Sequence, residues 1–134
     1  MTKRSDFESW SQVEIGLKRA LRKLRRVGDM VAIYTSGATI MSIGNESGGL
    51  MPPGFRCTAH GDSALKDLTP KDGRYKASGL IPGFGSSDYE SDRVPAPDAI
   101  RWVADLARAW KLDASSVRIE FMSLDKSSPL YKSL

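Results

Sequence analysis

The sequence MVAIYTSGATIMSI, residues 30–43, predicts a β-hairpin. Both halves are rich in β-branched and apolar residues, which strands favour, and they flank Ser36-Gly37, a dipeptide suited to a two-residue turn. With that turn, alternation gives two largely apolar faces: Val31, Ile33 and Ile40 on one, and Ala32, Tyr34, Met41 and Ile43 on the other. We therefore expect the hairpin to be central in its sheet and covered on both sides.

An amphipathic helix is predicted before the hairpin, over residues 6–27. Its apolar residues recur at three- and four-residue steps and form one stripe: Trp10, Val13, Leu17, Ala20, Leu21, Leu24 and Val27. Ser5 or Asp6 can cap the start of this helix. Gly28 is a natural stop, because glycine tolerates the left-handed conformation that follows many helices.

A second helix and a further strand are predicted after residue 96. The helix covers residues 97–112, and Pro97 and Asp98 suit its first turn. The strand covers residues 116–124, in which Val117, Ile119 and Phe121 alternate with more polar positions.

The intervening residues 44–95 are dominated by Gly, Ser, Pro and Asp. Short strands near residues 55–60 and 74–80 and a helical turn at 62–68 are expected there, because long structureless stretches are rare in compact domains. The sequence as a whole predicts an α+β domain over residues 1–124, followed by a tail over 125–134. Two helices, 6–27 and 97–112, pack on an antiparallel sheet of about four to five strands that includes 29–35, 38–44 and 116–124.

Composition narrows the class of protein. The chain has 134 residues, a single cysteine and a single histidine, which excludes an intrachain disulfide and a Cys-rich zinc site and is typical of a reducing compartment. No apolar run is long enough to span a bilayer, and no apolar segment typical of a secretory signal follows Met1. We therefore expect a cytoplasmic protein.

Positive charge is concentrated near the N-terminus. Residues 1–28 contain eight Lys or Arg against three Asp or Glu, whereas the rest of the chain carries twelve against thirteen. The densest part of this segment is an acid-free run whose cations are Lys18, Arg19, Arg22, Lys23, Arg25 and Arg26. On a helix they fall on an arc of about 160° opposite the apolar stripe, with Ile15 in its middle.

Such a face repels itself, and a polyanion relieves the repulsion. The sequence therefore predicts a binding protein whose basic helix contacts nucleic acid or another acidic partner. The acidic residues 86–92 offer a discriminating observation, because this segment could instead fold back and neutralise the helix.

Catalysis, a metal and a cofactor are not predicted. Cys57, His60 and Asp62 are the right residue types for a thiol nucleophile, a base and an orienting acid. However, residues three apart on a strand point to opposite faces, and the chain has no second histidine. One cysteine and one histidine are also too few ligands for a zinc site.

Two alternative functions use other parts of the chain. The first is a protein-interaction module, such as an inhibitor or assembly factor, that binds through the middle loops, where the glycine-rich residues 79–87 present Leu80, Ile81 and Phe84. Trp102 lies at the edge of the second helix's apolar stripe, where it either closes the core or serves a partner. The second alternative is a peripheral membrane-associated protein.

Overall fold

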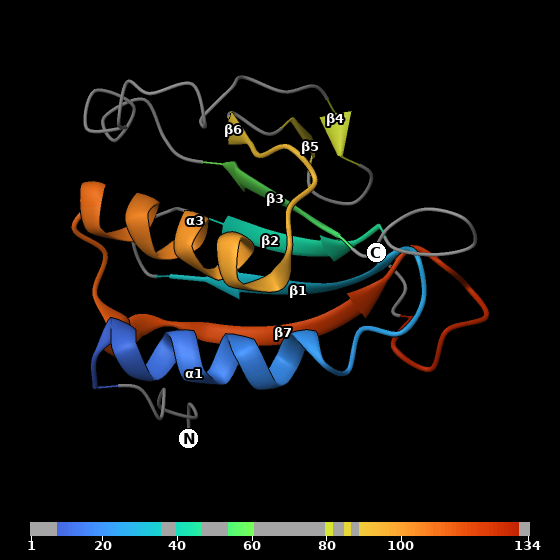
Figure 1. Ribbon diagram of the computed structural model, residues 1–134, viewed down its shortest axis with the longest axis horizontal. Coiled ribbons are helices and arrows are strands. Elements are labelled where there is room, and N and C mark those ends of the chain that lie inside the picture. The colour runs from blue at the N-terminus through green and yellow to red at the C-terminus, as the bar shows by residue number, and fades with distance from the viewer. Residues whose placement is uncertain are drawn as a thin grey trace.

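The computed structural model describes residues 8–35, 40–46, 54–60, 80–81, 85–86 and 89–131. Two helices pack on one face of a five-stranded antiparallel sheet, which confirms the predicted α+β fold (Figure 1). The sheet has the order β6-β3-β2-β1-β7, and β4 and β5 form a separate two-stranded pair. The elements are α1 (Trp10–Leu21), β1 (Asp29–Tyr34), β2 (Ile40–Asn45), β3 (Phe55–His60), β4 (Leu80–Ile81), β5 (Gly85–Ser86), β6 (Tyr89–Glu90), α3 (Ala96–Ala109), a 3-10 turn (Ala114–Ser116) and β7 (Arg118–Ser123).

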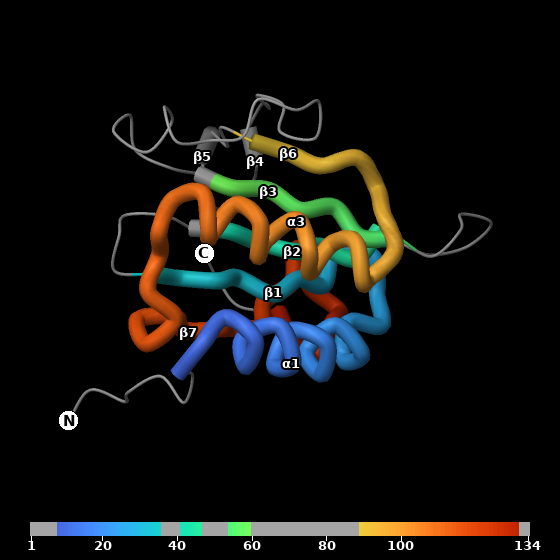
Figure 2. The backbone as a smooth tube through the Cα atoms, turned by 60° about the vertical axis from the view of Figure 1, so that its left-hand side comes forward, coloured from blue at the N-terminus to red at the C-terminus, as the bar shows by residue number. Residues whose placement is uncertain are grey.

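The main core lies between the sheet and the two helices, which run side by side over the same face (Figure 2). It combines α1 residues such as Leu17 with α3 residues such as Leu106, and both side chains are fully buried. The start of α1 is tied to the end of α3, because Trp10 Nε1 donates a hydrogen bond of 2.7 Å to the Leu112 carbonyl. The relative position of the two helices is therefore fixed by packing and by this bond.

The predicted hairpin is central in the sheet, but its predicted register is wrong by one residue. Val31 pairs with Ile43 and Ile33 with Met41, so all four side chains lie on the helix-covered face. A two-residue turn would have paired Ile33 with Ile40 instead. A shift of one residue moves every side chain of a strand to the other face. The residues of the predicted turn lie outside the described part of the chain.

The far face of the sheet is buried along its centre as well. Met30, Ala32 and Met122 form a second, smaller apolar cluster there, with Tyr34 packed against it. Next to this cluster the Ser42 and Thr58 hydroxyls share a buried hydrogen bond. Burial on both faces agrees with the apolar composition of the hairpin, although both described helices lie on one face only.

Helix α1 is shorter at both ends than the predicted 6–27. It begins after Ser9, whose hydroxyl accepts a hydrogen bond from the Gln12 N–H, and it ends at Leu21. The segment after the helix is held by tertiary contacts, because the Asn45 side chain donates to the carbonyls of Leu24 and Arg26.

Gly28 has the predicted positive φ, at +96°, but it shapes the turn into β1 and not the end of the helix. Its N–H donates to the Asn45 carbonyl and its own carbonyl accepts from the Leu124 N–H. Val27, assigned to the apolar stripe by the sequence, is 54% exposed because the chain has left the helix by then.

Helix α3 follows its prediction closely, with Pro97 and Asp98 in its first turn. It ends at Ala109, followed by Lys111 in the left-handed region at φ 54° and a bond from the Leu112 N–H to the Ala107 carbonyl. Among the described residues, neither helix is both long enough and apolar enough to cross a bilayer.

Most of the predicted strand near 74–80 and the helical turn at 62–68 lie outside the described residues, whereas the strand predicted at 55–60 is β3. Beyond Leu124 the chain docks back onto the domain. The Ser128 hydroxyl donates 2.6 Å to Asp29 Oδ1, and Leu130 packs against the main core.

Candidate functional site

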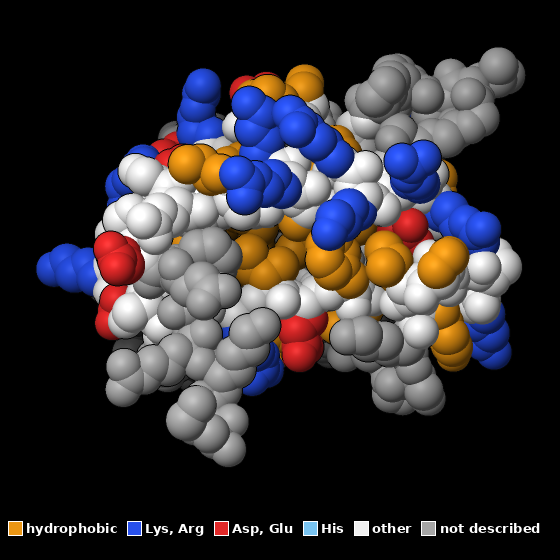
Figure 3. All heavy atoms as spheres, turned by 90° about the horizontal axis from the view of Figure 1, so that it is seen from below, with side chains coloured by type: hydrophobic (Ala, Val, Ile, Leu, Met, Phe, Trp, Pro, Cys, Tyr) orange, Lys and Arg blue, Asp and Glu red, His pale blue; other side chains and the backbone are white. Residues whose placement is uncertain are grey.

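The six cations singled out by the sequence are all exposed, and we call this surface the basic face. Lys18 and Arg19 belong to the last turn of α1, and Arg22 caps it. Lys23, Arg25 and Arg26 follow in the irregular segment that leads to β1, so the predicted single helical arc is broken after Arg22. Figure 3 shows Lys and Arg side chains gathered over this part of the surface, with hydrophobic side chains beside them.

Ile15 lies among these cations and is 54% exposed. Ile15 faces away from the buried stripe of α1, as the angle of about 100° between successive helical residues predicts. The other side of the helix is committed to the core, since Val13 and Leu17 are fully buried. The basic face therefore has an exposed apolar residue one helical turn before Lys18 and Arg19.

Among the described residues, no carboxylate oxygen lies within 4.0 Å of a charged side-chain nitrogen of the basic face. The acid nearest to the run in sequence, Glu14, instead lies 4.0 Å from Arg108 on α3. Two cations have contacts of another kind: Lys23 lies over the Phe121 ring, 5.6 Å from its centroid, and Arg26 donates to the backbone carbonyl and hydroxyl of Ser127. Within the described structure, ion pairs therefore do not neutralise the basic face, although the charge of Arg26 helps to lower the pKa of Asp125.

The described part of the acidic segment 86–92 does not cover the basic face. Its strand β6 forms one edge of the sheet, and β7, next to α1, forms the other (Figure 1). Glu90 is instead bound to Arg56, with 2.8 Å between Oε1 and Nη1. Residues 87 and 88 lie outside the described residues.

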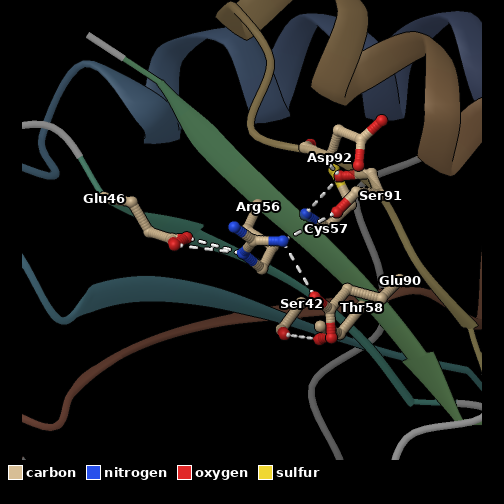
Figure 4. A network of polar contacts seen from close by, with 8 residues as sticks. All are labelled: Ser42, Glu46, Arg56, Cys57, Thr58, Glu90, Ser91 and Asp92. Atoms are coloured by element: carbon tan, nitrogen blue, oxygen red, sulfur yellow. Dashed lines mark hydrogen bonds and ion pairs between the residues drawn. The ribbon is translucent and has the colours of Figure 1, made fainter. Parts of the chain in front are cut away.

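Arg56 is the centre of a polar network on β3 (Figure 4). Its Nε donates 2.6 Å to Glu46 Oε2, and its Nη1 donates to Glu90 and, at 3.2 Å, to the Ser91 carbonyl. The hydrogen bond with Glu46 is the largest of the effects that raise the pKa of Arg56. The contacts of this arginine join β6, and the residue that follows β2, to β3.

An apolar groove of about 400 Å³ lies between α1 and the start of α3, beside the basic face. Its apolar lining is formed by Leu21, Phe55, Ala96, Pro97 and Ile100. Lys18 and Arg22 complete the lining, so two cations of the basic face also border the groove. Sequence reasoning missed this groove, although Ile100, which lies beside the main stripe of its helix, was a signal that could have pointed to it.

Cys57 is a core residue. Its side chain is fully buried, and its Sγ lies 3.4 Å from the Ala99 carbonyl oxygen. Burial raises the pKa of the thiol to about 12, so the thiolate needed for nucleophilic attack is not formed near neutral pH. Asp62, which the sequence offered as the orienting acid for Cys57 and His60, lies outside the described residues. Within the described residues, no three metal-binding side chains cluster.

The remaining candidate partner-binding residues divide into two groups. Trp102 is only 4% exposed and packs in the main core, which leaves little of its ring for a partner. Leu80 and Ile81 form β4, which pairs with β5, but their side chains and all of Phe84 lie outside the described residues.

Comparison with protein-family models, with curated proteins and with solved structures finds no match for this chain.

Proposed function

We propose that this protein binds a polyanion, nucleic acid, through the basic face. The observation that carries the proposal is the absence, among the described residues, of any ion pair between a carboxylate and the charged groups of the six exposed cations. Clustered positive charges raise the local electrostatic potential, and bound phosphates lower that potential. Each phosphate that a cation neutralises also releases counterions condensed on the nucleic acid. Four of the six are arginines, whose planar forks bind phosphate oxygens in pairs.

The composition of α1 favours nucleic acid over a membrane surface as the polyanion. An interfacial helix inserts a broad apolar face into lipid. Here the apolar stripe is buried against the sheet and α3, and Ile15 is the one large apolar side chain of α1 that is more than half exposed.

The cations differ in how freely they can bind. Arg26 holds Ser127, so its replacement disturbs the docked segment after β7 as well as the surface charge. The side chains of Arg19 and Arg22 are exposed and have no ion pair or hydrogen bond within the described structure. They are therefore the positions at which binding can be changed without changing the fold.

The test is a salt titration of binding to single-stranded and duplex oligonucleotides. Four phosphate contacts give a log–log slope of roughly −3 to −4, at about −0.7 to −0.9 per contact. The variant Arg19→Glu with Arg22→Glu is expected to lose binding at low salt and to keep the circular dichroism spectrum and unfolding midpoint of the wild type.

A matched control changes the net charge equally at a distance. Arg101→Glu with Lys111→Glu reverses two exposed cations of α3 and its end, outside the basic face. This control is expected to weaken binding far less than the basic-face variant. No binding of wild type at low salt, or equal losses in both variants, would contradict the proposal and leave an interaction module as the better account.

A further inference from the structure

We infer that the apolar groove between α1 and α3 accepts a base of a single-stranded nucleic acid whose phosphates lie on the basic face; the inference rests on the proposed function. The groove shares Lys18 and Arg22 with the basic face. One ligand can therefore occupy both surfaces, provided that it carries anionic and flat apolar groups in alternation along its chain. A single strand does so, because its bases are free to leave the backbone.

The shape and lining of the groove suit a base. A volume of about 400 Å³ lies in the range of pockets that hold small organic ligands. Leu21 is buried, whereas Phe55, Ala96 and Ile100 are half-buried and leave apolar surface for a ligand. Phe55 supplies an aromatic ring, the side chain on which bases stack in sequence-tolerant binding sites.

The charges around the groove select the anionic ligand. Lys18 and Arg22 are exposed, are one helical turn apart, and have no carboxylate partner within the described structure. They can hold a phosphate beside the groove while its base lies inside. A duplex keeps its bases stacked and paired, so it can use the basic face but not the groove.

A second cavity is less suited to an anionic ligand. It measures about 230 Å³ and lies at the first turns of α3, with Asp92, Asp98 and Arg101 among its lining residues. Two carboxylates beside one guanidinium disfavour an approaching phosphate. The groove beside Lys18 is therefore the one that continues the basic face.

The lining also predicts weak sequence preference. Apart from the two cations, the side chains that line the groove are apolar and cannot read the hydrogen-bonding edge of a base. Discrimination is left to stacking, which every base can provide.

The first experiment uses the wild-type protein and three ligands of equal length at one low salt concentration: a thymidine oligonucleotide, an abasic strand with the same phosphates, and a duplex. One base in the groove is expected to make the thymidine strand bind roughly 5- to 150-fold more tightly than the abasic strand. Equal affinity for the two strands would overturn the inference and leave the proposed function intact.

The second experiment separates the groove from the charge. Ile100→Lys adds a cation and removes apolar surface, so charge alone predicts tighter binding of both strand and duplex. The inference predicts weaker binding of the thymidine strand, with no loss for the duplex. Ala96→Phe, which fills the groove from a half-buried position, is expected to give the same strand-specific loss and serves where Ile100→Lys destabilises the fold.

Failure of the proposed function and failure of the groove assignment give different results. Absence of binding by every ligand contradicts the proposed function itself. Salt-dependent binding of all three ligands, lost in Arg19→Glu with Arg22→Glu but unaffected by Ala96→Phe, contradicts only the groove assignment. An acidic amphipathic peptide that binds wild type but not Ala96→Phe, with no difference between thymidine and abasic strands, would assign the groove to a peptide and overturn the inference.

Discussion

Arg56 and Arg22 carry the same side chain in opposite circumstances. Arg56 donates to two carboxylates and a carbonyl, from Glu46, Glu90 and Ser91. Arg22 is exposed at the end of α1, and its side chain has no ion pair or hydrogen bond in the described structure. An arginine whose donors are used within the fold stabilises that fold, whereas one whose donors face water is available to a ligand.

Within the described structure, the backbone of the basic face is held in place by hydrogen bonds to buried side chains and not by ion pairs. The Asn45 side chain, 3% exposed as a residue, binds the carbonyls of Leu24 and Arg26 from the inside. Asp29 accepts a hydrogen bond from the Arg26 N–H. The backbone that carries the cations is therefore fixed, while their side chains form no ion pair with the described acids. This contrast with Arg56 can be tested in each of the two regions.

Asn45→Ala should have the largest effect on stability. It removes two hydrogen bonds and leaves buried carbonyls without their donor, which costs about 2 to 3 kcal/mol of unfolding free energy. Urea denaturation measures this loss. Because Asn45 also positions the residues around Arg25, polyanion binding should weaken too. A loss of less than about 0.5 kcal/mol would contradict the assigned anchoring role.

Arg56→Ala should lower stability by about 1 to 2 kcal/mol, because it leaves Glu46 and Glu90 without their shared cation. The value is modest, since the Arg56 side chain is 37% exposed. Arg22→Ala should change stability by less than about 0.5 kcal/mol. In binding, the order reverses: Arg22→Ala weakens affinity and Arg56→Ala leaves it unchanged. Equal effects of the two substitutions in either assay would remove the distinction between the two regions.

Asp29 should make a smaller contribution to stability, one that is lost in acid. Burial alone would raise the pKa of Asp29, but hydrogen bonds from Ser128, Ser123 and the backbone near Arg26 outweigh it and lower the pKa. A lowered folded-state pKa contributes stability that is present above the unfolded value of about 3.9 and is lost as the pH falls through the folded value.

The variant Asp29→Asn should therefore differ from wild type by a constant amount above about pH 5 and by progressively less below about pH 4. Unfolding free energies measured between pH 2 and pH 7 test this. Wild-type and variant curves that stay parallel over the whole range would show that Asp29 titrates normally in the folded protein.

Cys57 is next to Arg56 on β3 but lies on the helix-covered face, and it should show no reactivity in the native state. Burial raises the pKa of the thiol to about 12, so labelling by a thiol reagent at pH 8 should require unfolding. The labelling rate should rise with urea in parallel with the unfolded fraction. Rapid labelling without denaturant would mean that β3, which carries both Arg56 and Cys57, opens locally in the folded protein.

The sequence predicts those features of this fold that depend on local periodicity. The stripe of α3 and the alternation of Val117, Ile119 and Phe121 lead to the correct helix and strand, because both patterns are local. The hairpin register depends on the turn, and the pattern alone could not exclude a shift of one residue, because both registers place apolar side chains on each face.

The candidate site was predictable in its composition but not in its shape. The exposure of Lys18 and Arg19 follows from helical geometry, and that of the cations after the helix agrees with their charge. The segment after α1 is tied to Asn45, more than twenty residues beyond Leu24, and the groove depends on Phe55 and Ile100 from two other elements. Such contacts arise from the tertiary fold and leave no periodic signal in the sequence.

The salt dependence of binding tests the central claim most directly when two arginines are neutralised. Binding of a single-stranded oligonucleotide should be measured at several salt concentrations for wild type and for Arg19→Gln with Arg22→Gln. If both arginines contact phosphate, the magnitude of the log–log slope should fall by about 1.4, at about 0.7 per contact. An unchanged slope would contradict the claim that the basic face binds the strand.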